Sequence, residues 1–459
     1  MPPFLLLAAV AIEGYVVLAA ELLAIRQLTP FVGTGTDTIA IVIAAVLLPL
    51  AFGYEAGGRA GLKAGDEDAV RRRLSRNLLA AAAILVVGLS HPTLVAFFET
   101  IAGLGIRHRL AQTAVYAMLF LALPVYLLGQ TVPLVGFCAP RADLPRFTGH
   151  VLFLSTLGSF LGSIVSTLVL MAFWGVHNTV ILTLSLLLVL VALVSWPVHR
   201  RHVAAAAGLV LCVAAFNNGG ALERLGIVGN NQYSQVKVVP VPGEASRLMI
   251  INNSLSSKFA ADPARRFPYV AFIEDEILKR LPADRPQRIL VIGAGGFTMG
   301  LADAVNRYTF VDIDPSLKAI SEEHFLRQAL GPNKTFVAEP ARAFLRRNGE
   351  PWDLVVLDAY SSGNDIPQDL VTREWFQAVR AALAPGGAVV MNVIASPAFA
   401  DRFSRSLDAT IRSVFPFVSR QIVLGSSGPT GNVVYLAFGR QDRPHEVYTD
   451  DRNRVFLDR

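Results

Sequence analysis

Apolar residues are distributed unevenly along the chain, with long runs in the first half and short runs in the second. A helix needs about 20 apolar residues to cross a bilayer, and six runs before residue 200 have roughly that length. A seventh run, Val203–Phe216, is only fourteen residues long and predicts a short span or an interfacial helix. The six predicted spans are Phe4–Ile25, Thr38–Ala60, Leu74–Phe98, Thr113–Cys138, Val151–Trp174 and Asn178–Trp196.

The second half has the pattern of an α/β domain. Two short alternating runs, Gln235–Val239 and Leu248–Ile251, flank a Pro-Gly turn and predict a β-hairpin or small sheet. Beyond Arg288, short apolar runs alternate with helical segments, which is typical of a mostly parallel sheet with helices on both faces. The last runs, Ser419–Leu424 and Asn432–Phe438, predict an antiparallel pair. We therefore expect a polytopic α-helical membrane domain over residues 1–220, a Rossmann-like α/β domain over 225–440, and a polar tail over 441–459.

Composition and loop charge agree with a membrane protein. The chain is 53% hydrophobic and 17% charged, whereas soluble proteins are about a quarter charged. Its net charge of +6 does not indicate nucleic-acid binding, because many of its arginines lie between apolar runs. Loops after the even-numbered spans carry ten basic residues against three in the other loops. The positive-inside rule then predicts an inner- or plasma-membrane protein with its N-terminus and soluble domain in the cytoplasm.

Polar and small residues inside the apolar half predict how its helices contact one another. Glu21 and Arg26 predict either an ion pair or a polar cavity, since an ionisable side chain in a bilayer needs a partner. Gly158 and Gly162 are four residues apart and predict close helix packing. The two cysteines lie in apolar runs away from any Cys/His cluster, so neither a metal site nor a disulfide is expected.

The stretch Arg288–Asp314 carries the clearest functional pattern. An apolar run ends at Ile292 and leads into a glycine cluster, a predicted helix, and a second apolar run that ends in an acid. Glycines let the backbone approach a ligand, and an acid at this distance can accept hydrogen bonds from ribose hydroxyls. A tight structural turn is the alternative interpretation. The candidate residues for an adenosine-type cofactor are Gly293, Gly295, Gly296 and Asp312.

Several segments occur together in the order seen in one known family. The soluble half resembles the spermidine/spermine synthase (polyamine aminopropyltransferase) family, whose fold is that of the class I methyltransferases. The helical half is similar to the integral-membrane, fused branch of this family, through Glu21…Arg26…Pro30…Gly33 and Gly53–Arg59. The matching segments of the soluble half are Tyr233–Val236, Ile289–Gly296, Val311–Asp314, Asp353–Asp358 and Leu383–Gly387.

The resemblance implies a transferase that uses S-adenosylmethionine or its decarboxylated form, without a metal. It assigns Asp358 as the general base and Tyr269 as the residue that helps to orient the amine. The implied cofactor contacts are Gln235, Gly293, Gly295, Gly296, Asp312 for the ribose, and Glu339 in place of an aspartate near the adenine. The segment Asp358–Pro367 is similar to the catalytic loop, so Tyr360 and Asp365 are the implied substrate-binding residues.

The acceptor side departs from the family pattern. Gly296-Phe297 stands where the family has an aspartate, and Tyr269-Val270 lacks the usual histidine. Asn364-Asp365 replaces a tighter acidic pattern in the catalytic loop. A dicationic amine such as putrescine needs carboxylates to replace its lost hydration, so a standard polyamine acceptor is not expected.

The expected function is transfer of an aminopropyl or related alkyl group to an amine, with a small-molecule or lipid-like acceptor. The enzymatic alternative is a methyltransferase or another sulfonium-cleaving enzyme on the same fold. Methylthioadenosine as product would indicate the first, and S-adenosylhomocysteine would indicate methyl transfer. A non-catalytic transporter or sensor that binds a nucleoside or polyamine is the third option. Nucleic acid is not an expected partner, and a homodimer is one assembly that the resemblance implies.

Overall fold

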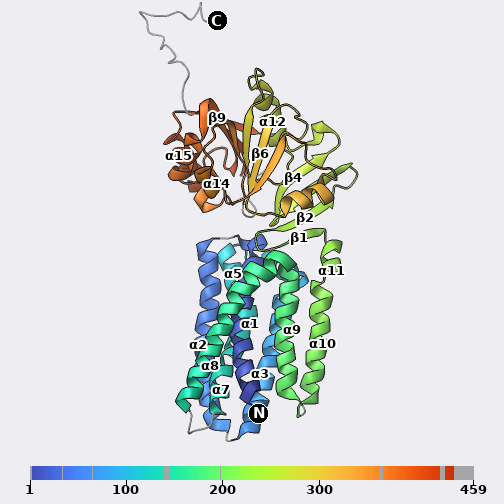
Figure 1. Ribbon diagram of the computed structural model, residues 1–459, viewed down its shortest axis with the longest axis vertical. Helices are drawn as coiled ribbons and strands as arrows, with labels where there is room; N and C mark the ends of the chain where they lie inside the picture. The colour runs from blue at the N-terminus through green and yellow to red at the C-terminus, as the bar shows by residue number, and fades with distance from the viewer. Residues whose placement is uncertain are drawn as a thin grey trace, which may run out of the picture. The chain divides into compact units, whose positions relative to one another are not determined.

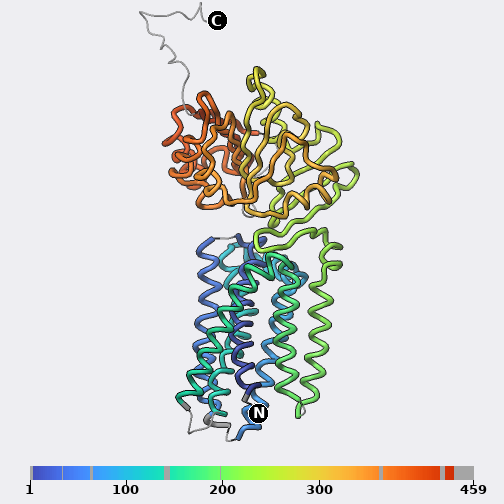
Figure 2. Tube along the Cα trace, in the orientation of Figure 1, coloured from blue at the N-terminus to red at the C-terminus, as the bar shows by residue number. Residues whose placement is uncertain are grey.

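The computed structural model describes residues 3–33, 35–64, 66–138, 144–196, 198–360, 365–423 and 430–438. The chain divides into two compact units (Figures 1 and 2). The helical unit comprises residues up to 239, residues 248–256 and Asp365. The sheet unit comprises residues 240–247, 257–360 and those from Ile366 onward. The predicted tail over 441–459 lies outside the described residues.

Long helices that run side by side make up most of the helical unit (Figure 1). The break between the first two helices is brief, and π-helical turns interrupt two of the later ones. Arg26 near the end of the first helix donates from Nε to the carbonyl of Asn231 at 2.6 Å, within the same unit. The helices are α1 (Pro3–Val32), α2 (Thr36–Ala64), α3 (Glu67–Gly88), α4 (His91–Gly103), α5 (Arg109–Ala117), α6 (Leu123–Gly129), α7 (Thr131–Phe137), α8 (Leu144–Val165), α9 (Gly175–Ser195), α10 (Arg200–Asn217) and α11 (Gly219–Arg224).

Among the described residues, four continuous helical stretches are long and apolar enough to cross a membrane: Phe4–Val32, Thr36–Gly61, Arg109–Phe137 and Pro145–Ser195. The last has 51 residues, about twice what one crossing needs, and turns at Gly175, where φ is +83°. That turn falls between the fifth and sixth predicted spans.

The third predicted span differs from the structure. Instead of one helix over Leu74–Phe98, α3 and α4 form a pair bent by 70°. The bend follows from Ser90 at the N-cap of α4 and a proline in its first turn, which cannot continue the preceding helix. The bent pair is a fifth candidate span, and the six-span arrangement stays a prediction.

Small residues bring α1 and α8 into close contact. A Cβ added at Gly158 would lie 2.1 Å from the carbonyl oxygen of Ala11. One added at Gly162 would lie 2.3 Å from the carbonyl oxygen of Tyr15. The backbones therefore approach so closely that no side chain fits between them, which confirms the packing expected from the four-residue spacing.

Gly158→Val should destabilise the helical unit by about 1–3 kcal/mol, because overpacking forces α1 and α8 apart. Gly149→Ala is a matched control on the same helix, since nothing lies within 4 Å of a Cβ added there. Thermal unfolding of the full chain in detergent measures both. Equal unfolding temperatures for the two variants would contradict the packing.

The sheet unit contains a seven-stranded mixed sheet in the order β10-β11-β9-β8-β5-β6-β7. Strands β9, β8, β5, β6 and β7 are parallel to one another, and β11 is antiparallel to both β9 and β10. Counted from β5, the order is 3-2-1-4-5-7-6, which confirms the class I methyltransferase-type fold. The strands are β5 (Arg288–Ile292), β6 (Arg307–Asp312), β7 (Lys334–Ala338), β8 (Trp352–Leu357), β9 (Leu383–Ala395), β10 (Phe417–Val423) and β11 (Gly431–Phe438).

A second, four-stranded sheet precedes it in sequence, in the order β1-β2-β3-β4. The predicted hairpin is thus part of a larger sheet. Its strands are β1 (Ile227–Asn230), β2 (Gln235–Pro240), β3 (Ser246–Ile251) and β4 (Ser254–Ala260).

Helices cover the large sheet through apolar side chains. Trp375 and Phe376 of α15 and Ile411 of α16 pack on strand residues such as Ile292 and Leu357. Burial of these large side chains is the main favourable contribution to the fold. The helices of this unit are α12 (Pro268–Glu276), α13 (Leu317–Ile320), α14 (Ala341–Arg347), α15 (Arg373–Ala381) and α16 (Arg402–Arg412).

The helix predicted directly after the glycine cluster was wrong. Turns and bends occupy residues 293–306. Gly295, Phe297 and Gly300 have φ of +48°, +59° and +62°, a left-handed conformation that cannot continue an α-helix. Phe297 accepts this conformation because its ring is fully buried against Phe310 and Phe336.

Candidate active site

Three parallel strands bring the predicted functional residues to one edge of the large sheet. Ile292 at the end of β5 pairs with Val311 of β6 on one side and with Leu357 of β8 on the other. The next positions along these strands are Gly293, Asp312 and Asp358, at the carboxyl edge where ligands of α/β sheets bind.

Gly293 is required at this edge by two features of its backbone. Its φ is +92°, which favours glycine. A Cβ at this position would lie 2.4 Å from the carbonyl oxygen of Asp358. The glycine thus lets the ends of β5 and β8 lie next to each other, which fixes Asp358 relative to the glycine loop.

Asp312, at the end of β6, forms hydrogen bonds that hold the glycine loop. Its Oδ2 accepts from the amide of Ala294 at 3.0 Å, and its Oδ1 accepts from the amide of Asp314 at 3.1 Å. Burial raises the pKa of this carboxyl to about 6, against the lowering effect of those amide donors. Each carboxylate oxygen has a second lone pair, so Asp312 can still accept hydrogen bonds from ribose hydroxyls.

Gly296 has a packing reason to be glycine. A Cβ there would lie 2.2 Å from the ring of Phe325, and the Gly296 amide donates to Ser257 Oγ at 2.9 Å. Its carbonyl oxygen accepts from Ser321 at 3.0 Å. The structure leaves no room for a side chain at this position, and its role toward a cofactor stays a prediction.

Asp358 follows β8 and receives two neutral donors. The hydroxyl of Tyr269, on α12, donates to Oδ2 at 2.9 Å, and Nδ2 of Asn392, on β9, donates to Oδ1 at 2.8 Å. Asn432 of β11 in turn donates to Oδ1 of Asn392 at 2.8 Å. Burial raises the pKa of the Asp358 carboxyl to about 6, although both hydrogen bonds oppose this rise. The carboxyl is therefore a base poised just below neutral pH.

Sequence reasoning missed Asn392 and Asn432. One signal was present, because Asn392 is a polar residue inside the apolar run Val389–Val393. A buried amide in such a run needs a polar partner. That the partner would be Asp358 depended on the pairing of β8 with β9, which the sequence alone does not specify.

The remaining predicted residues have different surroundings. The hydroxyl of Tyr360 donates to the carbonyl of Asn392 and accepts from the amide of Ile394, both at 3.0 Å, so β9 holds it in place. Glu339 follows β7 and forms an ion pair with Arg347 at 2.6 Å. Their roles toward substrate and adenine stay predictions.

Two predicted residues belong to the helical unit. Gln235 begins β2, and its buried Oε1 has no hydrogen-bond partner among the described residues; its role toward a cofactor stays a prediction. Asp365 lies 3.6 Å from Arg109, which also pairs with Asp37 at 2.9 Å. The other predicted residues, including Tyr269, Asp312 and Asp358, come together in the sheet unit.

A small apolar hollow adjoins Asn392 in the sheet unit. Aliphatic and aromatic side chains surround it, and it is part of the apolar packing between the large sheet and α15. It is lined by Ile292, Leu357, Ala359, Ile366, Leu370, Val371, Trp375, Met391 and Asn392.

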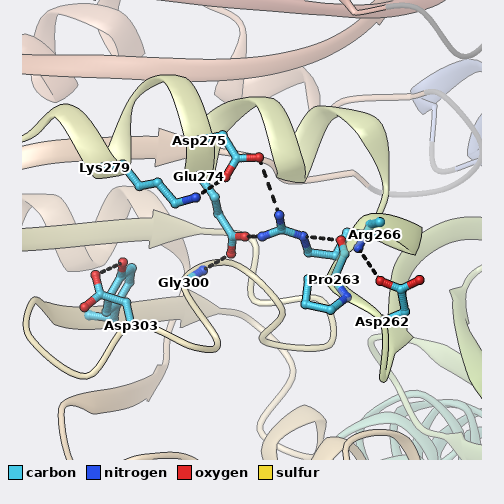
Figure 3. Close-up of polar contacts among 10 residues, drawn as sticks. Asp262, Pro263, Arg266, Glu274, Asp275, Lys279, Gly300 and Asp303 are labelled. Carbon is cyan, nitrogen blue, oxygen red and sulfur yellow. Dashed lines mark hydrogen bonds and ion pairs between the residues drawn. The ribbon is translucent and has the colours of Figure 1, made fainter.

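Glu274 of α12 holds the glycine loop at Gly300 (Figure 3). Its Oε1 accepts from the amide of Gly300 at 2.8 Å, and its Oε2 forms an ion pair with Arg266. Arg266 also donates to the carbonyl of Pro263 at 2.7 Å. Because α12 also carries Tyr269, this carboxylate connects the glycine loop to the helix that orients Asp358.

Glu274→Ala should weaken binding of methylthioadenosine by about tenfold, because the loop loses its anchor at Gly300 and a small displacement of a binding loop is costly. Asp275→Ala is the matched control: Asp275 contacts Arg266 and Lys279 but not the loop (Figure 3). Isothermal titration of the full-length variants compares the two. Equal affinities would show that Glu274 does not position the loop.

Asp358→Asn should stabilise the protein above pH 6 relative to the unmodified chain. A folded-state pKa raised to about 6 means that the stability linked to the protonated carboxyl is lost as pH rises through 6. The amide carries no charge to bury, so the stability that the variant gains over the unmodified chain should be larger at pH 8 than at pH 5 by about 1.4 kcal/mol, the equivalent of the one pH unit between pH 5 and the folded-state pKa. Thermal unfolding of both proteins at both pH values tests this, and a difference between variant and unmodified chain that does not grow from pH 5 to pH 8 would contradict it.

Part of this chain is similar to known aminopropyltransferases and to an N-methyltransferase. A stretch of 161 residues is 30% identical to a polyamine aminopropyltransferase of Vibrio vulnificus, covering 34% of this chain and 52% of that protein. Polyamine aminopropyltransferase 2 of Pseudomonas aeruginosa is 33% identical over 144 residues, 29% of this chain and 41% of that protein. Putrescine N-methyltransferase 2 of Nicotiana attenuata is 32% identical over 131 residues, 27% of this chain and 34% of that protein.

These matches span about half the length of the relatives or less, and no family model matches the chain. Two similar solved structures are a probable spermidine synthase from Corynebacterium glutamicum and a spermidine synthase from Thermotoga maritima. The first aligns with a TM-score of 0.39 at 25% identity, over 46% of this chain and 78% of that one. The second aligns with a TM-score of 0.36 at 18% identity, over 47% and 74%. On the sequence matches, part of the chain is similar to polyamine aminopropyltransferases.

Proposed function

We propose that the chain transfers an aminopropyl or related alkyl group from a sulfonium nucleoside to an amine. The observation that carries this proposal is the buried Asp358 carboxylate, which is held between Tyr269 and Asn392 directly beside Gly293. The similarity to polyamine aminopropyltransferases supports it.

Asp358 would act as the base that deprotonates the amine. An amine reaches the site as an ammonium ion, whose nitrogen has no lone pair to attack with. The ionised carboxylate attracts this cation and takes one proton from it at Oδ1 or Oδ2. The freed lone pair then forms the new C–N bond as the C–S bond breaks, and its electrons stay on the departing thioether. Tyr269 and Asn392 keep the carboxylate in place throughout.

The glycine loop suits a cationic donor better than an anionic one. Dinucleotide sites place a diphosphate at the positive N-terminus of the helix that follows the glycines. Here turns occupy residues 293–306, so no helix dipole opposes a sulfonium charge. Asp312 would bind the ribose, and Glu339, which follows β7, would lie near the adenine.

The transferred group distinguishes two versions of the proposal. Aminopropyl transfer requires decarboxylated S-adenosylmethionine and leaves methylthioadenosine. Methyl transfer from S-adenosylmethionine leaves S-adenosylhomocysteine, and the similarity to a putrescine N-methyltransferase favours it as the second candidate. Both versions need the same base.

The helical unit would anchor this chemistry at a membrane. Its long apolar helices are the basis of the proposal, and the charges of the loops predict six spans with the sheet unit in the cytoplasm. A membrane anchor would give the enzyme access to a lipid-like or membrane-delivered amine. A reporter fused at Asp450 should give a cytoplasmic signal, and an extracytoplasmic signal would reverse the orientation.

Purified full-length protein should form methylthioadenosine from decarboxylated S-adenosylmethionine and an amine. Asp358→Asn should lower the rate at least about 100-fold through loss of the base, with methylthioadenosine affinity unchanged. Asp369→Asn is the control, since this acid is exposed and pairs only peripherally, with Arg342 at 3.7 Å. Mass spectrometry of the nucleoside product measures turnover. Full activity of Asp358→Asn would remove its role as base, and nucleoside binding without any product would indicate a sensor.

The rate should fall about tenfold per pH unit below pH 6, because Asp358 must be ionised to accept a proton. Tyr269→Phe removes a hydrogen bond that lowers the pKa of Asp358, so the midpoint of this limb should move to higher pH. The pH profile of kcat/KM gives the midpoint for both proteins. An identical midpoint would mean that Tyr269 does not act on the ionisation of Asp358.

A further inference from the structure

We propose that the helical unit binds a phosphate monoester at the start of α4, between this helix and β2. Three side chains form the site, those of Lys237, His91 and Gln27, and all three belong to the helical unit. None of them takes part in the proposed transfer reaction, so the two proposals stand independently. The site is inferred from a cation, a helix end and a buried amide oxygen that lack partners.

Lys237 supplies the positive charge of the site. It lies on β2 and is half-buried, and among the described residues no acid pairs with its ammonium group. Burial lowers the pKa of Lys237, and no charged neighbour counteracts this effect. An ammonium group removed from water without a counter-ion costs free energy, which a bound anion would recover.

The start of α4 supplies backbone donors. The first amides of a helix have no acceptor within it, and they form the positive end of the helix dipole. Ser90 occupies the N-cap but does not cap these amides with its side chain, because its hydroxyl donates to the carbonyl of Val86. Pro92 has no amide hydrogen, so the donors of this end are those of His91 and Thr93. An uncapped N-terminus of a helix of this length, 13 residues, suits a phosphate.

The side chain of His91 lies at the same end of α4. It is 5% exposed, and its ring has no hydrogen-bond partner in the part of the chain that the structure describes. The ammonium group of Lys237 acts electrostatically on this ring, so the two side chains lie close to each other. Each of them can donate a hydrogen bond to the same oxyanion.

Gln27 of α1 places an acceptor at this end of the helix. Its Nε2 donates at 3.0 Å to the carbonyl of Leu89, two residues before His91. A carbonyl can only accept, so the orientation of this amide is fixed and Oε1 points away from Leu89. Gln27 is 8% exposed, and its Oε1 is buried without a hydrogen-bond partner among the described residues. A buried acceptor of this kind needs a donor.

These groups together select the chemical class of the ligand. Lys237, His91 and the amides of α4 favour an oxyanion, whereas Oε1 of Gln27 requires a hydroxyl on the same ligand. A phosphate monoester provides both near neutral pH, because its second pKa is about 6. A sulfate or a carboxylate is fully ionised at this pH and has no hydrogen to donate.

Two sources offer a phosphate monoester at this place. Asn217, at the end of α10, donates from Nδ2 to Oγ of Ser90 at 3.2 Å. The site therefore lies at the end of the helical unit where the chain passes from the long helices to the small sheet. If these helices span a bilayer, the headgroup of a phosphatidate reaches this end from the membrane surface. Inorganic phosphate or a small monoester reaches it from the water.

Isothermal titration of the full-length protein in detergent at pH 6 tests the site, with inorganic phosphate, sulfate and dihexanoyl phosphatidic acid as probes. We expect phosphate to bind about tenfold more tightly than sulfate, and Gln27→Met should abolish this difference. Lys237→Gln should weaken phosphate binding about tenfold through loss of a charge-assisted hydrogen bond. Lys258→Gln is the matched control, since Lys258 on β4 of the same small sheet already pairs with Glu244 at 3.1 Å.

A second measurement separates binding from a structural role of Lys237. In phosphate-free buffer, Lys237→Gln should unfold at the same or a higher temperature than the unmodified chain, because it removes an unpaired half-buried charge. A lower unfolding temperature would show that Lys237 stabilises the fold and would overturn the proposal.

The remaining outcomes identify the ligand or reject the site. Binding of both inorganic phosphate and phosphatidic acid supports a site open to free phosphate, and binding of phosphatidic acid alone supports the same site with a lipid as its ligand. Absence of binding for both probes, or equal phosphate affinity in Lys237→Gln, would overturn the proposal. Equal affinities for phosphate and sulfate in the unmodified chain would overturn the assignment to a phosphate monoester.

Discussion

The burial of one carboxylate among neutral donors is the constraint on which the rest of the site depends. Asp358 sits at the end of β8 with Tyr269 on one oxygen and Asn392 on the other. A carboxylate without a cationic partner is costly to bury, and the cost appears as a pKa raised to about 6. The same arrangement makes it a usable base near neutral pH and leaves its charge available to an incoming cation.

Three structural features keep Asp358 in this position. The register of β5, β6 and β8 aligns Gly293, Asp312 and Asp358 at one edge, and the absence of a side chain at Gly293 allows the strand ends to meet. The side-chain amide of Asn432 on β11 donates to that of Asn392 on β9, which in turn donates to Asp358. No helix follows the glycine loop, which is held by two side chains instead. Asp312 accepts from the amide of Ala294, and Glu274 accepts from the amide of Gly300.

Much of the fold followed from the sequence because its signals are local. Alternating runs located the strands, and the four-residue spacing of Gly158 and Gly162 indicated the contact of α1 with α8. The glycine cluster was correctly placed after β5, but the helix expected to follow it was wrong, because the burial of Phe297 stabilises a left-handed conformation that no local pattern reveals. Asn392 was missed for the same reason, since its significance depends on strand pairing over more than thirty residues. The membrane position of the helical unit and the roles of Gln235, Tyr360 and Glu339 stay predictions.

The central claim is that the carboxyl edge of the large sheet binds a sulfonium nucleoside and presents Asp358 to an amine. A structure of the full-length protein with methylthioadenosine bound tests this most directly. The account predicts ribose hydroxyls on the carboxylate of Asp312, the thioether sulfur beside Gly293 and Gly295, and adenine near Glu339. A nucleoside bound away from Asp312, with Asp358 remote from the sulfur, would contradict it.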